Sequence, residues 1–481
     1  MQDRVSQYPG RIKLTPVSGQ ENVYDMEWAD GATVEGTALN KANLLADATA
    51  TSLGLTSTAT PNDAFGKLQE NILDERPEIG EIRATAETSL GSNWLLCNGA
   101  QITSSQYSQL YNLLSSDLRT RFSAYNISTG ESTPLVISVV TYINNRFVIV
   151  SRENKSSGSY ESYGVFITSS SNGTSWTTEK VYEDGNAFYV TGIAYAGGKY
   201  VISLEYIDYG QGTINPTILY GTSLTGTFTA KIISGSGSYY TSGFSVAAKG
   251  SYFILHGSVN EGSSSSANYT SVIWVLNASS LSTTYMYAIN WGIILGQSPS
   301  SIMVLGNYWV LYHGGILRYT TTAAPSSMSS WSSYDMQIDN NNYFIYGGIY
   351  IGSRYIFFSN SSDVVLVSSS SSINSKYTTV QSVTGSSAPY TTYLAAVGNT
   401  ALATGNNGKA AIATAPFTSW TKFNLPSTSS GRCASNGDIV ITLMGTSTSA
   451  GVIQGNRAYG RTLPTISPDK SRAFIKARSG K

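Results

Sequence analysis

The sequence predicts a mainly β protein: a seven-bladed β-propeller inserted into a small α+β domain, behind a short N-terminal helical segment. Three observations carry this prediction: a degenerate repeat between Phe122 and Leu443, a constant spacing inside it, and non-repeating segments on both sides of it. A period of roughly 40 to 50 residues, holding four short strands and turns rich in Gly and Asn, is typical of propeller blades.

Each copy of the repeat has two halves. One half is a pair of short strands around a tight turn, and the residue after that turn is Phe147, Tyr200, Tyr252, Trp309, Tyr355, Ala401 or Ile439. The other half begins at an aromatic residue, namely Trp176, Phe228, Tyr285, Trp331, Tyr377 or Trp420. The step from this aromatic to the next post-turn residue, as from 176 to 200, is 24 in five successive copies. One half is therefore fixed, and the other tolerates insertions.

The seventh copy lacks its outer unit, which stands instead at the front of the repeat. Residues 121–127 (Arg-Phe-Ser-Ala-Tyr-Asn-Ile) match residues 419–425 (Ser-Trp-Thr-Lys-Phe-Asn-Leu). We therefore expect the segment at Phe122 to supply the outer strand of the blade that contains residues 433–443. Such closure leaves no open sheet edge for aggregation.

Composition excludes several classes of protein. The formal net charge is zero and only 12% of residues are charged, so we expect no nucleic-acid partner. No stretch reaches the ~18 apolar residues of a membrane span, and residues 1–5 do not open a signal peptide. The two cysteines, Cys97 and Cys433, are expected to be reduced in a protein made in a cytoplasm. The 33 tyrosines, with abundant Ser, Thr, Gly and Asn, resemble a binding paratope; no cofactor is indicated.

Residues 1–75 lack the repeat and carry two helix signals. Thr37 could cap a helix over residues 38–46. Residues 60–63 (Thr-Pro-Asn-Asp) supply a cap, a proline at the first helical position and an acid, ahead of an apolar stripe. The stripe comprises Phe65, Leu68, Ile72 and Leu73. We expect this stripe to serve either oligomerisation and docking or the formation of a small local core.

The segments that flank the repeat carry a family resemblance. Gly80-Glu81-Ile82, then residues 94–99 (Trp-Leu-Leu-Cys-Asn-Gly), then a helix with Tyr107, Leu110, Tyr111 and Leu114 resemble the opening of the phage tail collar domain. The closing pieces of that family, a Leu-Pro segment and a last strand, resemble residues 460–466 and 472–477. The propeller would thus be inserted within the collar. We expect four parts: 1–75, 76–120 (collar, first part), 121–454 (propeller) and 455–481 (collar, closing segment).

The resemblance implies a function. Collar proteins are found in tail fibres and baseplate tips, and residues 30–40 resemble, more weakly, the N-terminal segments of tail proteins from phages of Gram-positive hosts. This implies a homotrimer at the tail tip of a virion, whose residues 1–75 attach to baseplate or other tail proteins while the distal domain touches the host.

The candidate binding residues come from the loops between the second and third strands of the first three blades. These loops are long and lie in consecutive blades on one face, where binding functions concentrate. The candidates are Tyr160, Tyr163, Glu205, Tyr206, Asp208, Tyr209, Asn260, Glu261 and Tyr269. Tyrosine rings stack on sugars, and the polar side chains form hydrogen bonds with sugar hydroxyl groups. Such a surface suits an uncharged or weakly charged polysaccharide. Neutral drift in loop length is the competing explanation.

Other chemistry has weaker support. His256 and His313 each follow a post-turn aromatic by four residues, so they are weak candidates for a shared metal or catalytic role. Residues 170–176 resemble an Asp-box, with Asn172 in place of Asp. In sialidase-like propellers this box has a structural role. A sialidase needs clustered arginines, but Arg146 and Arg354 lie in turns on the opposite face from the long loops.

The favoured hypothesis is a non-enzymatic receptor-binding tail protein that attaches to a bacterial surface glycan. Acidic loop residues keep a second hypothesis open, a glycan hydrolase on the same scaffold, because such enzymes need two carboxyl groups about 5 to 10 Å apart. A third is a purely structural tail-tip protein. Glycan binding followed by product analysis separates the three.

Overall fold

A computed structural model gives the fold of the chain. It describes residues 12–28, 47–56, 58–74, 82–85, 94–97, 100, 102–103, 105–114, 122–153, 163–185, 188–206, 216–233, 240–260, 269–289, 302–313, 316–336, 345–359, 363–385, 393–405, 408–426, 431–443, 451–459 and 472–476.

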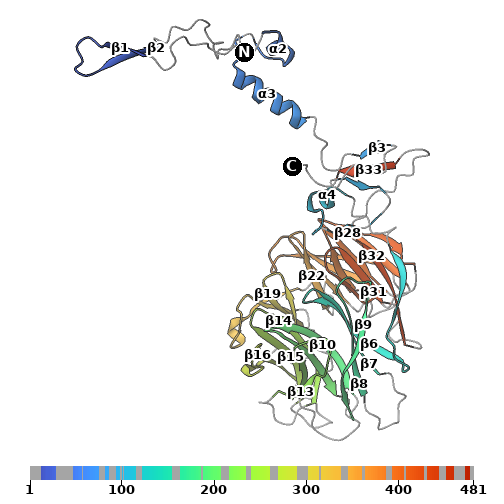
Figure 1. Ribbon diagram of the computed structural model, residues 1–481. Coiled ribbons are helices and arrows are strands. Elements are labelled where there is room, and N and C mark those ends of the chain that lie inside the picture. The colour runs from blue at the N-terminus through green and yellow to red at the C-terminus, as the bar shows by residue number, and fades with distance from the viewer. Residues whose placement is uncertain are drawn as a thin grey trace.

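Seven four-stranded antiparallel sheets in this part of the chain form the blades of a propeller (Figure 1). Blade 1 comprises β6 (Leu135–Ile143), β7 (Arg146–Glu153), β8 (Tyr163–Ser170) and β9 (Thr177–Asp184). Blade 2 comprises β10 (Phe188–Ala196), β11 (Lys199–Tyr206), β12 (Thr217–Gly221) and β13 (Thr229–Ile232). Blade 3 comprises β14 (Tyr240–Lys249), β15 (Tyr252–Asn260), β16 (Tyr269–Asn277) and β17 (Thr283–Ile289).

The remaining blades follow the same order. Blade 4 comprises β18 (Met303–Leu305), β19 (Tyr308–His313), β20 (Ile316–Thr320) and β21 (Ser332–Asp335), with the 3-10 turn η1 (Met328–Ser330) before β21. Blade 5 comprises β22 (Ile345–Ile351), β23 (Arg354–Ser359), β24 (Val364–Ser368) and β25 (Tyr377–Gln381). Blade 6 comprises β26 (Tyr393–Val397), β27 (Thr400–Thr404), β28 (Lys409–Thr414) and β29 (Thr421–Asn424).

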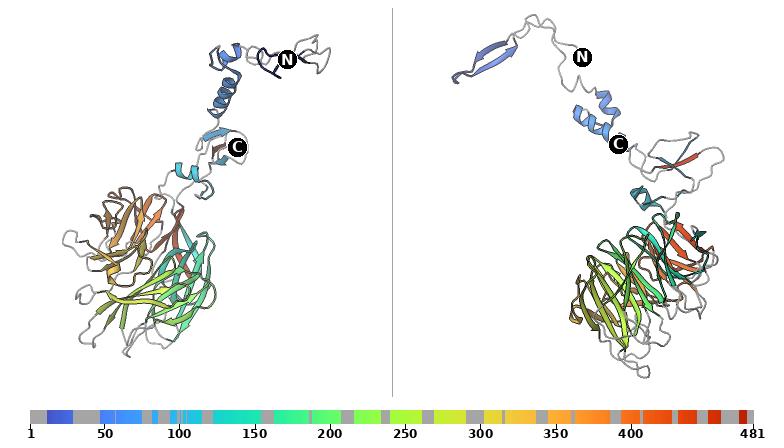
Figure 2. Two further views of the ribbon diagram at one scale, coloured as in Figure 1. Left: turned by 90° about the vertical axis from the view of Figure 1, so that its left-hand side faces the viewer. Right: turned by 60° about the horizontal axis from the view of Figure 1, so that its bottom comes forward.

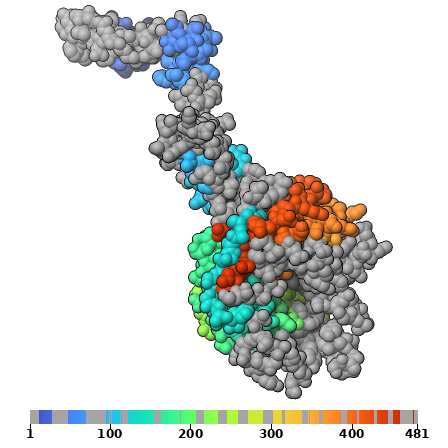
Figure 3. Space-filling view, turned by 90° about the vertical axis from the view of Figure 1, so that its right-hand side faces the viewer, coloured from blue at the N-terminus to red at the C-terminus, as the bar shows by residue number. Residues whose placement is uncertain are grey.

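Blade 7 joins the two ends of the repeat. It comprises β30 (Cys433–Ser435), β31 (Ile439–Leu443), β32 (Val452–Tyr459) and β5 (Ser123–Ser128). The first strand of every blade contacts that of the next, and β30 contacts β6, so the ring is closed. In Figure 3 the red residues of β32 lie beside the cyan residues of β5. The predicted closure is therefore confirmed. The boundary expected at residue 454 falls inside β32, so it is wrong: the propeller continues to Tyr459.

Tight turns join the first two strands of most blades. In blade 1 the two turn residues, Asn144 and Asn145, both have positive φ, the geometry that matches the twist of a β-hairpin. The register corrects two of the seven repeat positions. The residues equivalent to Phe147 are Phe253 in blade 3 and Val440 in blade 7, each one residue later than expected. Both positions follow another apolar residue, so sequence alone could not decide which one faces the core.

Buried apolar side chains fill all seven interfaces between neighbouring blades in the described part of the chain. Trp309 of blade 4, for example, packs with Ile254 of blade 3, and Phe147 of blade 1 packs with Ile441 of blade 7. The core is thus a circular series of interfaces, and each blade depends on both neighbours.

The collar is a three-stranded sheet with one helix. Its central strand is β33 (Arg472–Lys476), between β3 (Ile82–Thr85) and β4 (Trp94–Leu96). Ile475 pairs with both Ile82 and Leu95, and it packs with Cys97 and with Leu110 of α4 (Ser108–Leu113). The predicted split collar is therefore present.

The N-terminal segment contains a hairpin and a short helix, α2 (Asp47–Ser52), that the sequence did not predict. β1 (Ile12–Pro16) and β2 (Tyr24–Trp28) form a hairpin. They precede α2 and α3 (Pro61–Asp74). The cap of α3 is as expected: Asp63 accepts a hydrogen bond from the Thr60 backbone N–H, and the Thr60 hydroxyl accepts one from the Asp63 N–H. The helix expected over residues 38–46 lies outside the described residues. Figure 2 shows these elements and the collar on one side of the propeller.

Candidate functional site

The two ends of the propeller ring differ in what they carry. We call the end with the turns between first and second strands the proximal face, and the opposite end, where second strands connect to third strands, the distal face. The Tyr111 hydroxyl of α4 donates a hydrogen bond to the carbonyl of Gly437, in the first turn of blade 7 (3.4 Å). Strand β5 begins and β32 ends at this same face. The collar therefore joins the proximal face, and the distal face points away from it.

The connections between second and third strands, on the distal face, are long in four of the blades. In blades 7, 1, 2 and 3 they comprise residues 444–451, 154–162, 207–216 and 261–268. In blades 4, 5 and 6 they comprise only residues 314–315, 360–363 and 405–408. The four blades with long connections are consecutive in the ring. The sequence had indicated blades 1 to 3 and missed blade 7, because β32 was not recognised as its third strand.

The structure places some of the candidate residues at the distal ends of strands. Glu205 and Tyr206 end β11, while Asn260 ends β15 and pairs with Tyr269, which begins β16. Tyr163 begins β8, but its side chain is only 8% exposed and packs in the core between blades 1 and 2. It is therefore not the exposed loop ring that was expected. Tyr160, Asp208, Tyr209 and Glu261 lie outside the described residues.

A pair that the sequence did not indicate joins blades 1 and 2 on this face. The Arg152 guanidinium lies 5.1 Å from the ring centre of Tyr189 and 5.8 Å from that of Tyr163, within the range of cation–π attraction. Tyr189 pairs with Glu205 across β10 and β11. Two candidate residues, Tyr163 and Glu205, thus flank Arg152 and Tyr189. The sequence had indicated candidates only in the loops. Arg152 and Tyr189 lie on strands, so the sequence did not indicate them.

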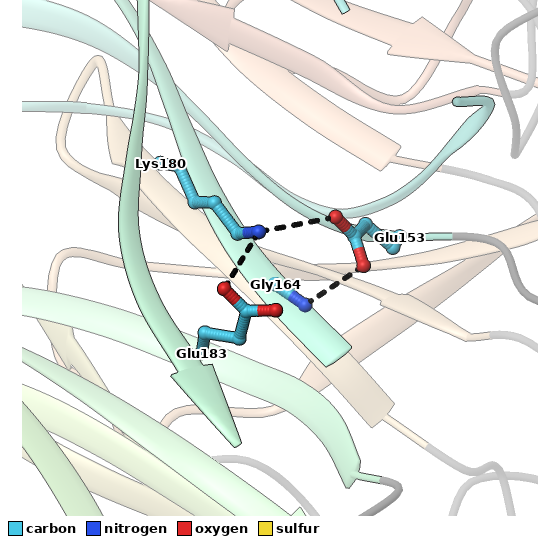
Figure 4. A network of polar contacts seen from close by, with 4 residues as sticks. All are labelled: Glu153, Gly164, Lys180 and Glu183. Atoms are coloured by element: carbon cyan, nitrogen blue, oxygen red, sulfur yellow. Dashed lines mark hydrogen bonds and ion pairs between the residues drawn. The ribbon is translucent and has the colours of Figure 1, made fainter. Parts of the chain in front are cut away.

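A charged network ties the outer strands of blade 1 together (Figure 4). Lys180 on β9 contacts Glu183 (2.8 Å) and the buried Glu153 (3.5 Å). The other oxygen of Glu153 accepts a hydrogen bond from the Gly164 backbone N–H (3.2 Å). The hydrogen bond to Glu183 and the attraction of both carboxylates raise the pKa of Lys180, despite partial burial. Both acids are therefore held as partners of a cation, a geometry that anchors strand ends.

The two histidines do not occupy equivalent places. His256 follows Phe253 by three residues and is fully buried within β15, whereas His313 follows Trp309 by four and ends β19. The equivalence of the two positions, on which the expected shared role depended, is therefore wrong. Within the described ranges no group of three or more metal-ligating side chains occurs.

The Asp-box-like turn is structural in its geometry. The Asn172 carboxamide oxygen accepts hydrogen bonds from the backbone N–H groups of Thr174 and Ser175 (both 2.9 Å). Arg457 of β32 donates to the carbonyl of Gly173 (2.9 Å). The turn therefore fastens blade 1 to the closing blade on the proximal face.

Comparison with known proteins decides the broad identity. Residues 80–123, which contain β3, β4 and α4, match the family described as Phage Tail Collar Domain. The chain therefore contains a phage tail collar domain. The structure adds β33, from the far end of the chain, as the central strand of that domain. In the described part of the chain, no helix is long and apolar enough to span a membrane.

Several solved structures resemble this chain but share little sequence with it. YCF48 bound to D1 peptide has a TM-score of 0.42 and 11% identity, over 71% of this chain and 96% of that one. Trypanosoma rangeli sialidase has a TM-score of 0.37 and 11% identity, over 60% and 56%. PorZ, a surface component of the type-IX secretion system of Porphyromonas gingivalis, has a TM-score of 0.39 and 10% identity, over 67% and 37%. These likenesses say nothing about what this chain binds. A search of curated proteins gives no match.

Proposed function

We propose that this phage tail protein attaches the virion to a bacterial surface glycan through the distal face of its propeller. The observation that carries the proposal is the arrangement of that face. It lies opposite the collar, and it gathers the long connections of four consecutive blades onto a rigid closed ring. Long connections on a rigid scaffold favour binding, and the tyrosine-rich composition favours sugars.

The N-terminal segment supplies the opposite attachment, to the tail. The β1–β2 hairpin is amphipathic: Leu14 and Met26 are opposite each other on one side, and Lys13 and Glu27 form an ion pair on the other (3.6 Å). Leu14 and Met26 are 54% and 69% exposed. A two-stranded hairpin is at best marginally stable alone, so its apolar side favours a protein partner. We assign that partner to the baseplate or another tail protein.

Oligomerisation would strengthen attachment. Each tyrosine-sugar contact contributes about 1 kcal/mol, too little for tight binding by one head. A homotrimer, and several copies on one virion, would multiply weak contacts into strong adhesion. Phe65 and Leu68 on α3, which are exposed in the single chain, provide an apolar stripe for such association.

Binding to isolated wall polysaccharides from a panel of Gram-positive bacteria tests the proposal. The full-length protein should bind at least one of them, and replacing residues 207–215 by a Gly/Ser linker of equal length should weaken binding. Arg354→Ala, on the proximal face, should not. Weakening by Arg354→Ala alone would show that the wrong face was chosen. Shortened glycan products after incubation would indicate a hydrolase instead of a non-enzymatic receptor-binding protein.

A further inference from the structure

Tyr189 presents an open aromatic ring at the seam between blades 1 and 2. It is the second residue of β10, and side chains alternate along a strand. Its neighbours Phe188 and Val190 are buried in the core, whereas Tyr189 is 49% exposed. A register shift between Val190 and Gly192 follows at once. Such bulges redirect side chains and often lie beside binding sites.

Arg152 holds this ring in place from the neighbouring blade. Its guanidinium lies against both Tyr189 and Tyr163, and Nη1 donates to the Glu153 carbonyl (3.2 Å). The Nε atom is buried, without a hydrogen-bond partner among the described residues. The cation is thus packed under the aromatic rings. We assign it a positioning role, in which it fixes the orientation of Tyr189.

Among the described residues, carboxylates outnumber cations near the distal ends of the strands of blades 1 and 2. The acids are Glu153, Glu183, Asp184 and Glu205, against the cations Arg152, Lys180 and Lys231. Glu153 and Glu183 are engaged by Lys180, and the Tyr182 hydroxyl donates to Asp184 (2.8 Å). An anionic polymer would meet like charges here, which is unfavourable. Hydroxyl groups, by contrast, are good donors to a carboxylate.

We infer that Tyr189 is the stacking platform for one uncharged sugar ring of the receptor, with Glu205 accepting hydroxyl hydrogen bonds beside it. The apolar face of the sugar lies on Tyr189, and Arg152 keeps the ring in the required orientation. The acidic rim makes the site discriminate against phosphate-rich or uronate-rich polysaccharides. This inference rests on the proposed function and narrows it to a residue and a ligand class.

The experiment compares full-length variants on two probe sets: neutral wall polysaccharides, and wall polysaccharides that carry phosphate or uronate. Wild type should prefer the neutral set, with affinity insensitive to salt. Tyr189→Ala should lower that affinity about five- to tenfold, the equivalent of one lost stacking contact. Tyr189→Phe should retain it. The matched control is Tyr350→Ala, a tyrosine of similar exposure on the proximal face, which should bind like wild type.

The role of Arg152 has its own readout. Arg152→Met should weaken binding as Tyr189→Ala does, and Arg152→Lys should restore part of it, since lysine can also lie on an aromatic face. Thermal unfolding of each variant separates lost binding from lost folding. Wild-type binding with an unaffected Tyr189→Ala would overturn this inference and leave the proposed function standing. Preference for the acidic set would overturn the ligand class, and binding to neither set would overturn the proposed function as well.

Discussion

The hydroxyl of Tyr111 and the carbonyl of Gly437 meet across 326 residues of sequence. One belongs to the collar helix and the other to the first turn of the closing blade. This contact orients the molecule, because it places the collar beside the proximal face and leaves the distal face free for a ligand. The following predictions test the arrangement on which that orientation depends.

Removing β5 should open the ring. Residues 129–459 retain three strands of blade 7 but lose the outer one, so β32 becomes an unpaired edge. Exposed edges promote association, and we expect aggregates by size-exclusion chromatography with light scattering. Residues 122–459, which keep β5, serve as the control and should be monomeric. A monomeric, cooperatively folded 129–459 chain would contradict the closure.

The split collar predicts selective thiol exposure. Cys97 packs against Ile475 and Cys433 lies in the propeller, and both are buried. A chain that ends at residue 471 lacks β33, so a thiol reagent should modify Cys97 and leave Cys433 protected. In the full chain, neither thiol should react with the reagent until the protein is denatured. Equal reactivity of the two thiols in the shortened chain would mean that β33 is not a specific part of the collar.

The buried position of Tyr163 predicts a stability effect. Truncating a large buried aromatic side chain to alanine costs about 3 to 5 kcal/mol, so Tyr163→Ala should lower the unfolding free energy measured in urea by that order. Tyr163→Phe keeps the ring and should cost far less. If Tyr163→Ala instead reduced glycan binding without reducing stability, the tyrosine would belong to the binding surface.

Lys180 predicts a loss of stability at alkaline pH. Because hydrogen bonding to Glu183 and attraction to Glu153 raise its pKa above the ordinary 10.5, the folded state gains stability from it below pH 10.5. That gain disappears as pH rises through the raised pKa. The difference in unfolding free energy between wild type and Lys180→Met should therefore shrink as the pH rises above 10.5.

The sequence predicted the architecture better than the site. The spacing of 24 residues marks the blades because it reflects a fixed crossing between them, and Thr60 with Asp63 marks the start of α3 through local hydrogen bonds. Site residues depend on side-chain direction. Tyr189 points outward and Tyr163 points inward because of their positions along a strand, and the sequence did not indicate which side of each strand is buried.

The sequence did not predict the β1–β2 hairpin or β32, for a related reason. β1 and β2 are five residues each and, among the described residues, pair only with each other. The residues of β32 include Gln454, Gly455, Asn456 and Arg457, which are poor strand formers or charged. Its place in the sheet is fixed by its neighbours β31 and β5 and not by its own composition.

The double connection between collar and propeller has a mechanical consequence. A virion held at one end and a cell wall held at the other would put the molecule under tension. Both covalent links enter blade 7 from the proximal face, through the adjacent antiparallel strands β5 and β32. Tension would pull these strands in the same direction, so it would not peel one from the other. Two parallel tethers share the load, and the hydrogen bonds between β31 and β32 resist it in shear.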